Sequence, residues 1–275
     1  MSDLYQYFDN NPGRLIHKLA HYFNIYERHF GAYRGRPITV IEYGVSHGGS
    51  LQMWKQYFGP QAQIIGVDIN PRCASLAEPG IEIHIGDQED PATHRALIER
   101  YGAFDIVIDD GGHSMRQQIV TFEEMYPAVK DGGVYLAEDL LTSYFANWGG
   151  GWRKSDTFIE FSKKMIDQLV AWYKPCPECQ ADYITHTAYG LHFYDSMLVV
   201  EKKNVPNPQE LMTGIPSFAV GQNEFDLLLD HDIRKGKIAD AIAKCRGVLD
   251  GNPDPAQSNH ARARLNVLEA MLTPK

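Results

Sequence analysis

The residues best suited to chemistry lie in two short acidic stretches. The first is the run DDGGH over 109–113, which follows a strand-like segment, and the second is the pair ED at 138–139, which follows another. If the two strands are neighbours in a parallel sheet, their ends bring three carboxylates together, and these repel one another unless a cation neutralises them. Oxygen ligands at a partly open site favour Mg²⁺, or Mn²⁺ in its place. We predict a divalent cation bound by Asp110, Glu138 and Asp139.

His113 lies three residues after Asp110 and is placed to act beside this cation. An alcohol has a pKa far above 7, so a reaction at its oxygen needs a base that removes the proton. A bound metal lowers that pKa, and an imidazole with a pKa near 6.5 accepts the proton. We predict His113 as the base, although alone it would equally be a loop residue. Asp109 is expected to point towards a cofactor or into the structure.

Three more strand-like segments end in residues that suit an adenosine-containing ligand. A glycine-rich turn begins at Gly44 after the first, the second ends at Asp68, and Asp87 and Gln88 follow the third. Glycines let a ligand approach the backbone, a carboxylate accepts from both ribose hydroxyls, and an acid or amide binds the amine of adenine. Each residue alone also has a simple structural role, Gly44 in a turn and Asp68 as a cap. Together they predict an adenosyl site.

Glu42, at the end of the first of these segments, narrows the choice of ligand. A carboxylate in the first turn repels the pyrophosphate of a dinucleotide. It suits a ligand that carries an ammonium and a sulfonium group. We therefore predict S-adenosylmethionine rather than NAD as the cofactor.

The elements that must position these residues alternate along the chain. Near-continuous apolar strands separated by helices indicate a parallel α/β sheet covered on both faces, the Rossmann-like class. Two later strand-like segments, over 181–187 and 192–201, predict a hairpin at the sheet edge. Strands are predicted over 38–43, 64–68, 81–85, 104–109 and 132–137, and helices over 50–58, 91–101, 117–129 and 157–173.

The two ends of the chain are predicted to be helical. Apolar spacing predicts one amphipathic helix over 14–33, on which His17, His21 and His29 pack or face solvent. Helices over 224–249 and 256–272 form a hairpin that we expect to pack on the main domain or on another subunit. The expected domains are a helical segment 1–36, a cofactor-binding domain 37–203, a linker 204–222 and a helical appendage 223–275.

Composition limits the class of protein. The chain has 275 residues and 44% hydrophobic residues, which is ordinary for a soluble globular protein. We find neither a secretory signal nor an apolar run of the roughly 18 residues that span a membrane, so a cytoplasmic location is expected. The net charge of −9 argues against nucleic acid as the main partner. Cys176 and Cys179 form a CPEC pair, predicted to be reduced, with a weak zinc site or a redox pair as the alternative.

A long loop over 141–156 follows the second acidic stretch and contains three consecutive glycines. Long loops over a site are often lids, and glycines supply the hinge. Three aromatic residues of this loop would stack on a sugar or an apolar group of a substrate, or else anchor the loop to the core: Tyr144, Trp148 and Trp152.

Several of these segments together resemble class I S-adenosylmethionine-dependent methyltransferases. Within that family they resemble the branch of macrolide-sugar O-methyltransferases, of the mycinamicin and macrocin type, and the cephalosporin hydroxylase/rhamnosyl O-methyltransferase group. The carrying segments are HYFNIYERHF, IEYGVSHGGSLQMW, GVDINP, GDQED, DIVIDDGGH and GGVYLAEDLLTSY, which lie between residues 21 and 144. DIVIDDGGH and GGVYLAEDLLTSY are the specific ones.

The resemblance implies a seven-stranded sheet with a last antiparallel hairpin, Mg²⁺ on the three predicted carboxylates and His113 as the base. It implies a sugar hydroxyl as the acceptor, on a small-molecule glycoside or a sugar nucleotide, and a homo-oligomer. The cofactor contacts that it implies are Glu42, Gly44, Ser46, Ser50, Asp68, Asp87 and Gln88.

Two other functions stay open from the sequence. A phenol or catechol would bind the same metal through its oxygens and would need less help from His113. A cofactor-binding scaffold without catalysis is the second alternative, with the C-terminal helices as its interaction module. An iron oxygenase is not expected, because it needs two histidines and one carboxylate where only His113 is present.

Overall fold

The structure is a computed structural model that separates into two compact units, Met1–Pro206 and Asn207–Lys275. It describes the whole chain except residues 1, 174–177, 179, 215–220, 252 and 273–275. The CPEC cysteines, Cys176 and Cys179, lie outside the described residues. No helix among the described residues is long and apolar enough to cross a membrane.

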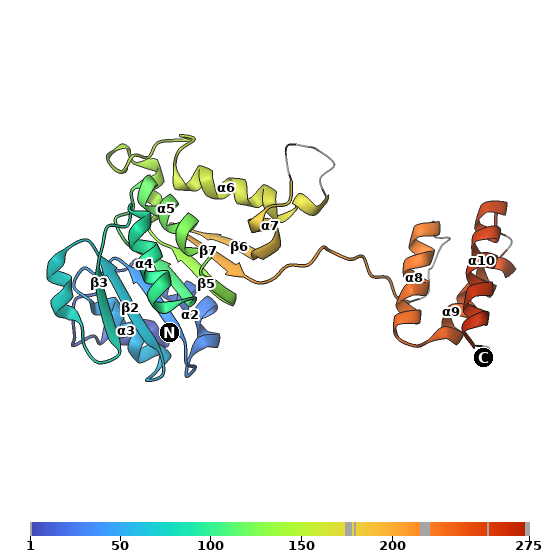
Figure 1. Cartoon of the computed structure of the whole chain (residues 1–275), viewed down its shortest axis with the longest axis horizontal. Coiled ribbons are helices and arrows are strands. Elements are labelled where there is room, and N and C mark those ends of the chain that lie inside the picture. The colour runs from blue at the N-terminus through green and yellow to red at the C-terminus, as the bar shows by residue number, and fades with distance from the viewer. Residues whose placement is uncertain (1, 174–177, 179, 215–220, 252, 273–275) are drawn as a thin grey trace. The chain divides into compact units, whose positions relative to one another are not determined.

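A seven-stranded sheet forms the centre of the first unit (Figure 1), with the strand order β3-β2-β1-β4-β5-β7-β6. The first five strands are parallel, and β7 runs antiparallel to both β5 and β6. This confirms the predicted α/β class and its antiparallel edge hairpin. The strands are β1 Thr39–Tyr43, β2 Gln63–Asp68, β3 Ile81–Ile85, β4 Phe104–Asp109, β5 Val129–Ala137, β6 Ala188–Tyr194 and β7 Met197–Lys202.

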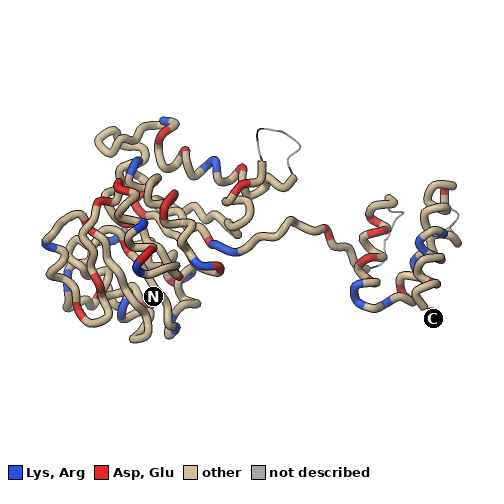
Figure 2. Tube along the Cα trace, viewed as in Figure 1, with Lys and Arg blue, Asp and Glu red and all other residues tan. Residues whose placement is uncertain are grey.

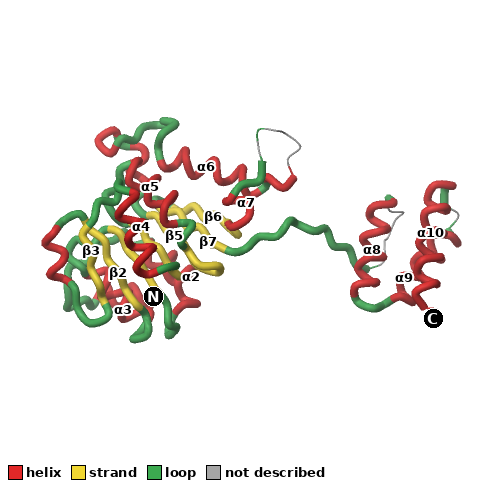
Figure 3. Tube along the Cα trace, viewed as in Figure 1, coloured by secondary structure: helices red, strands yellow, loops and turns green. Residues whose placement is uncertain are grey.

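Helices cover both faces of this sheet (Figures 1 and 3), because successive strand residues point to opposite sides. Val40 packs into one core with α2 and α3, whereas Ile41 packs into the other with α4, α5 and α6. Trp54 of α3 is fully buried and lies edge-on to Tyr26 at 5.0 Å between ring centres. The helices are α1 Asp3–Asp9, α2 Tyr22–Phe30, α3 Gly49–Phe58, α4 Pro91–Tyr101, α5 Met115–Met125 and α6 Phe158–Leu169.

The prediction of one helix over 14–33 is wrong for its first part. Residues 11–20 form no helix, and α2 begins only at Tyr22. The helical spacing of apolar residues is not a sign of packing here, because Leu15 and Leu19 are 63% and 39% exposed and do not pack with the core. Residues 11–20 instead run as a non-helical strap, and Lys18 of this strap is buried among carboxylates.

The edge hairpin lies later in the chain than predicted. Residues Tyr183–Thr187 form the short helix α7, so the strand predicted over 181–187 is wrong. Asp182 caps this helix by accepting a hydrogen bond from the backbone N–H of Thr185 at 3.1 Å. This local side-chain bond favours a helical turn over a strand. The hairpin is made by β6 and β7 instead.

The second unit has three helices among its described residues, α8 Gln222–Arg234, α9 Ile238–Asp250 and α10 Pro255–Leu272. The single helix predicted over 224–249 is wrong, because the chain turns at Gly236, whose φ of +71° suits glycine. Phe225, Leu229 and Cys245 lie in the core of this unit. Acidic and basic residues are interspersed along the trace of both units (Figure 2).

Candidate functional site

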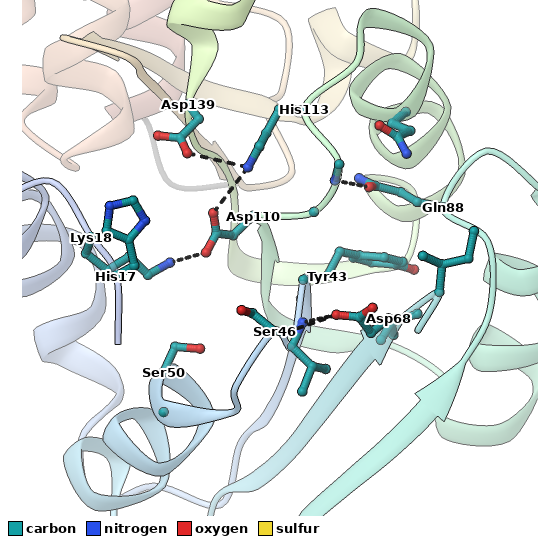
Figure 4. A pocket seen from close by; sticks show the side chains of 18 of the residues that line it. His17, Lys18, Tyr43, Ser46, Ser50, Asp68, Gln88, Asp110, His113 and Asp139 are labelled. Carbon is teal, nitrogen blue, oxygen red and sulfur yellow. Dashed lines mark hydrogen bonds and ion pairs between the residues drawn. The ribbon is translucent and has the colours of Figure 1, made fainter. Parts of the chain in front are cut away.

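A cavity of about 360 Å³ opens at the carboxyl ends of β1, β2 and β4 (Figure 4). The strand order reverses beside β1, since β2 lies on one side of it and β4 on the other, and ligands of open α/β sheets bind at such a point. Nine predicted site residues line this cavity: Gly44, Ser46, Ser50, Asp68, Asp87, Gln88, Asp110, His113 and Asp139. The strap also contributes residues 15–18 to the lining. His17, which was expected to pack or face solvent, therefore lines the cavity.

The turn after β1 is held in place by Asp68. One oxygen of its carboxylate accepts hydrogen bonds from the backbone N–H groups of Val45 at 2.9 Å and Ser46 at 3.0 Å. Its other oxygen accepts from the N–H of Asn70 at 2.8 Å. Asp68 therefore shapes the turn, and the remaining lone pairs of its oxygens are what a ribose would have to use.

Gly44 allows a close approach between the turn after β1 and the turn after β4. Its φ is +92°, and a Cβ built at this position would lie 1.8 Å from the carbonyl oxygen of Asp110. No side chain fits there without moving the backbone of Asp110. Gly44 is thus required to bring the turn after β1 and the turn after β4 together.

We expect Gly44→Ala to displace Asp110 and to lower the free energy of unfolding more than a positive φ alone explains. The matched control is Gly35→Ala, at a φ of +69° with no atom within 4 Å of the built Cβ. The control should lose about 1–2 kcal/mol for the left-handed backbone. Gly44→Ala should lose at least about 2 kcal/mol more for the clash. Urea denaturation of both variants measures the difference, and equal losses would contradict the steric argument.

Gln88 links the third strand end to the fourth. Its amide nitrogen donates to Oδ1 of Asp109 at 2.5 Å, and its amide oxygen accepts from the backbone N–H of Gly112 at 2.9 Å. Asp109 is completely buried, does not line the cavity, and has its pKa raised to about 6 by burial. Asp109 therefore points into the structure, the second of the two orientations expected for it.

Glu42, a predicted cofactor contact, is completely buried and is not among the residues that line the cavity. One oxygen accepts a hydrogen bond from the Ser50 hydroxyl at 2.7 Å, and the other has no hydrogen-bond partner in the described part of the chain. Burial raises the pKa of Glu42. The nearest cation to the second oxygen is the ammonium of Lys18 at 3.5 Å.

Asp110, His113 and Asp139 come together at the mouth of the cavity (Figure 4). Nε2 of His113 lies 3.4 Å from Oδ2 of Asp139 and 3.9 Å from Oδ1 of Asp110. Both His113 and Asp139 have a positive φ, of 55° and 54°. Non-glycine residues adopt this conformation at a cost, and such residues concentrate at functional sites.

Glu138 is the third predicted carboxylate, and it lies deeper than the other two. It is completely buried, and its oxygens accept from the Tyr26 hydroxyl at 2.7 Å and from Nζ of Lys18 at 2.8 Å. Tyr22 performs a parallel role for Asp139, donating to Oδ1 at 2.8 Å. Helix α2 therefore supplies two tyrosines that orient two of the predicted metal ligands.

Lys18 is a site residue that the sequence analysis missed. Its side chain is only 2% exposed, and Nζ lies 2.5 Å from Asp110 and 2.8 Å from Glu138. Burial by itself lowers the pKa of Lys18, but the negative charges of Asp110 and Glu138 raise it by more. The net pKa lies well above the usual value, so the ammonium stays protonated. In the sequence, Lys18 is only a lysine shortly before the HYFNIYERHF segment. Its two partners are 92 and 120 residues away, so nothing local indicates the contact.

The charge balance leaves room for a further cation. One ammonium, that of Lys18, faces three carboxylates, those of Glu42, Asp110 and Glu138, and Asp139 lies beside them. Carboxylates taken out of water need compensation by positive charge. Ligand atoms of Asp110, His113 and Asp139 also lie within 4.8 Å of one another. These residues fit a divalent cation in both charge and donor type.

Of the three loop aromatics, Trp148 lies nearest this cluster, with its ring centre 6.0 Å from that of His113. Tyr144 and Trp152 lie 6.0 Å apart, and both are exposed. None of the three lines the cavity. Trp148 thus lies edge-on to His113, and all three rings present surface to solvent.

Comparison with known proteins finds relatives of this chain. No family model matches the chain. The chain is 38% identical over 197 residues to the 8-demethyl-8-(2-methoxy-alpha-L-rhamnosyl)-tetracenomycin-C 3'-O-methyltransferase of Streptomyces olivaceus, across 67% of this chain and 50% of that protein. It is 37% identical over 188 residues to the mycinamicin VI 2''-O-methyltransferase of Micromonospora griseorubida, across 64% and 47%.

A similar solved structure is the MycE methyltransferase from the mycinamycin biosynthetic pathway, in complex with Mg, SAH and mycinamycin VI. It shares 32% identity and a TM-score of 0.66, over 84% of this chain and 58% of that one. The chain spans about half the length of the curated relatives it matches.

Proposed function

Because this chain belongs to the class I methyltransferases, in the branch of the macrolide-sugar O-methyltransferases, we propose that it methylates a sugar hydroxyl with S-adenosylmethionine as methyl donor. The acceptor would be a small-molecule glycoside or a sugar nucleotide. One observation carries the proposal: His113, Asp110 and Asp139 meet at the mouth of the cavity, beside the turn that begins at Gly44. That arrangement supports a base and a cation site next to a cofactor site.

The cofactor would lie along the turns after the first three parallel strands. Asp68 would accept from the ribose, while Asp87 and Gln88 lie at the end where adenine would bind. Ser46 and Ser50 line the same cavity. Glu42 does not line the cavity, but one of its oxygens makes no hydrogen bond in the described part of the chain, and its negative charge would attract a cationic methionine portion.

His113 would act as the base. When bound, S-adenosylmethionine supplies the electrophilic methyl group, and a divalent cation lowers the pKa of the acceptor hydroxyl. Nε2 of His113 faces the carboxylates of Asp110 and Asp139, and from there it would take the hydroxyl proton. Asp139 would stabilise the imidazolium that forms, at 3.4 Å. Trp148, beside His113, would help to keep water from this place.

The cation would be held by Asp110, Glu138 and Asp139. Asp110 and Asp139 line the cavity and are accessible to an ion. Glu138 is engaged by Lys18 and Tyr26, so it would be free to hold a cation only if Lys18 moved away from it. Lys18 and a divalent cation therefore compete for the same carboxylates.

Calorimetric titration with S-adenosylhomocysteine, with and without Mg²⁺, tests the proposal. We expect micromolar binding to the wild-type chain, and binding at least about tenfold weaker for Asp68→Asn, which loses a charged acceptor. Asp240→Asn, on a helix of the second unit, is the control and should bind like the wild type. Absence of binding in both conditions would remove the methyltransferase function and leave a scaffold that has lost its cofactor.

A further inference from the structure

A second group of metal-binding side chains lies away from the cavity, where α2 meets the edge hairpin. His29 comes from the last turn of α2, His192 from β6 and Glu201 from β7. One ligand atom of each residue lies within 4.8 Å of the others. None of the three lines the cavity described above, and the proposed methylation does not use them.

The distances within this group match those of a coordinated ion. The carboxylate of Glu201 contacts both rings, whose centres lie 4.7 Å apart: Oε1 is 3.1 Å from Nδ1 of His29, and Oε2 is 3.4 Å from Nε2 of His192. In a tetrahedral zinc site with bonds of 2.0–2.1 Å, neighbouring ligand atoms are about 3.3 Å apart. The two nitrogen–oxygen separations, each to a different oxygen of Glu201, are therefore close to those that such an ion imposes.

His192 supplies an observation that a simple ion pair leaves unexplained. Its Nε2 is buried and makes no hydrogen bond with any residue that the structure describes. The space beside this nitrogen exists because residue 190 is glycine: a Cβ there would lie 3.1 Å from Nε2 and 3.8 Å from Oε2 of Glu201. A buried nitrogen that makes no hydrogen bond is costly, and a metal ion would use its lone pair.

His29 has the outer partner that a metal-bound histidine usually needs. Its Nε2 lies 2.9 Å from the hydroxyl of Tyr194, which leaves Nδ1 to face Glu201 and His192. A hydrogen bond on the far ring nitrogen fixes the tautomer and the orientation of the ring.

We propose that His29, His192 and Glu201 bind a transition-metal ion, with Zn²⁺ as the best fit, and that this ion fastens the edge hairpin to α2. Two imidazoles and one carboxylate are the protein ligands of zinc sites that take water as a fourth ligand, and the same set also binds iron(II). The same helix carries Tyr22 and Tyr26 to Asp139 and Glu138. The ion would thus brace the helix that orients the proposed catalytic carboxylates.

The test is zinc titration of the whole chain after removal of metals with a chelator, read by competition with a chromophoric zinc indicator. Asp110→Asn and Cys176→Ser/Cys179→Ser are introduced together, so that other zinc-binding groups do not contribute. In this background we expect one zinc equivalent to bind and to raise the melting temperature. His192→Ala should weaken this binding at least about 100-fold and abolish the shift in melting temperature. His231→Ala, on α8, is the control and should change neither.

Tyr194→Phe separates a metal site from a purely structural contact. It keeps all three ligands and removes only the partner of Nε2 of His29, so we expect zinc affinity to fall about tenfold. Replacement of zinc by Co²⁺ should give the visible absorption of a four-coordinate ion in the wild-type group, and His192→Ala should lose it. If His192→Ala and Glu201→Gln, folded by circular dichroism, bind zinc as strongly as the background chain, the proposal is wrong. Absence of zinc binding in the background chain would overturn it equally.

Discussion

Lys18→Met is expected to lower the free energy of unfolding by about 3–5 kcal/mol at neutral pH, because it leaves buried carboxylates without their cation. Nζ of Lys18 contacts Glu42, Asp110 and Glu138, and two of these are completely buried. Methionine keeps most of the side-chain volume, so lost packing contributes little. Urea denaturation at pH 7.5 measures the effect.

The matched control is Lys55→Met. Lys55 also pairs with a glutamate, Glu78 at 3.2 Å, but its side chain is 35% exposed. An exposed pair of this kind contributes less than about 1 kcal/mol, so the control should be nearly as stable as the wild type. Equal losses in the two variants would show that burial of Lys18 has no special effect.

The loss in Lys18→Met should grow as the pH rises. Burial raises the pKa of Glu42 and of Glu138, and a carboxyl whose pKa is raised on folding stabilises the protein at low pH and loses that effect as pH rises. Without the ammonium, both pKa values rise further. The difference from the wild type should therefore be small near pH 5 and largest above pH 7. A difference that shrinks with rising pH would contradict this account.

Mg²⁺ provides a second readout of the same variant. If Lys18 and a divalent cation compete for Asp110 and Glu138, Mg²⁺ should stabilise Lys18→Met more than it stabilises the wild type. The melting temperature as a function of Mg²⁺ concentration measures this. An equal effect on both proteins would place the ion away from Lys18.

The sheet was predictable from sequence because its strands are nearly continuous apolar runs. Ile64 and Ile65 point to opposite faces, and both are completely buried, as a parallel sheet between two helical layers requires. The acidic turns could then be placed together, because the carboxyl ends of neighbouring parallel strands share one edge. The predicted nearness of Asp110 and Asp139 rests on this topology.

The strap was not predictable from the same signals. Leu15 and Leu19 have helical spacing, yet both are exposed, and the segment follows the cavity wall instead. Contacts with residues distant in the chain hold its course, those of Lys18 with two carboxylates and those of Arg14 with Leu76 and Glu78. Tertiary contacts of this kind override local periodicity, and a single sequence does not reveal them. The same holds for His29 and His192, which only the packing of α2 on the hairpin brings together.

His113→Ala is expected to lower the rate of methyl transfer to a sugar hydroxyl by about 10²–10⁴-fold, the usual contribution of a general base. S-adenosylhomocysteine should bind with nearly unchanged affinity, because the cofactor contacts proposed here come from the turns after β1, β2 and β3. The measurement pairs initial rates, on a panel of rhamnosyl and macrolide glycosides, with calorimetry on the same preparations. His231→Ala, on α8 of the second unit, is the matched control and should keep both the rate and the affinity.

The size of this loss also distinguishes the acceptor class. A sugar hydroxyl stays protonated near neutral pH and depends on the base, whereas a phenol ionises near pH 10 and, bound to a metal, needs little help. A nearly normal rate of His113→Ala on a catechol, together with no turnover of glycosides by the wild type, would favour the phenolic acceptor. Loss of both rate and cofactor binding would instead mean that His113 supports the turn itself. Its carbonyl already accepts a hydrogen bond from Thr142 at 2.9 Å, and the alanine variant keeps that bond. We therefore expect the effect to lie in the chemistry and not in the fold.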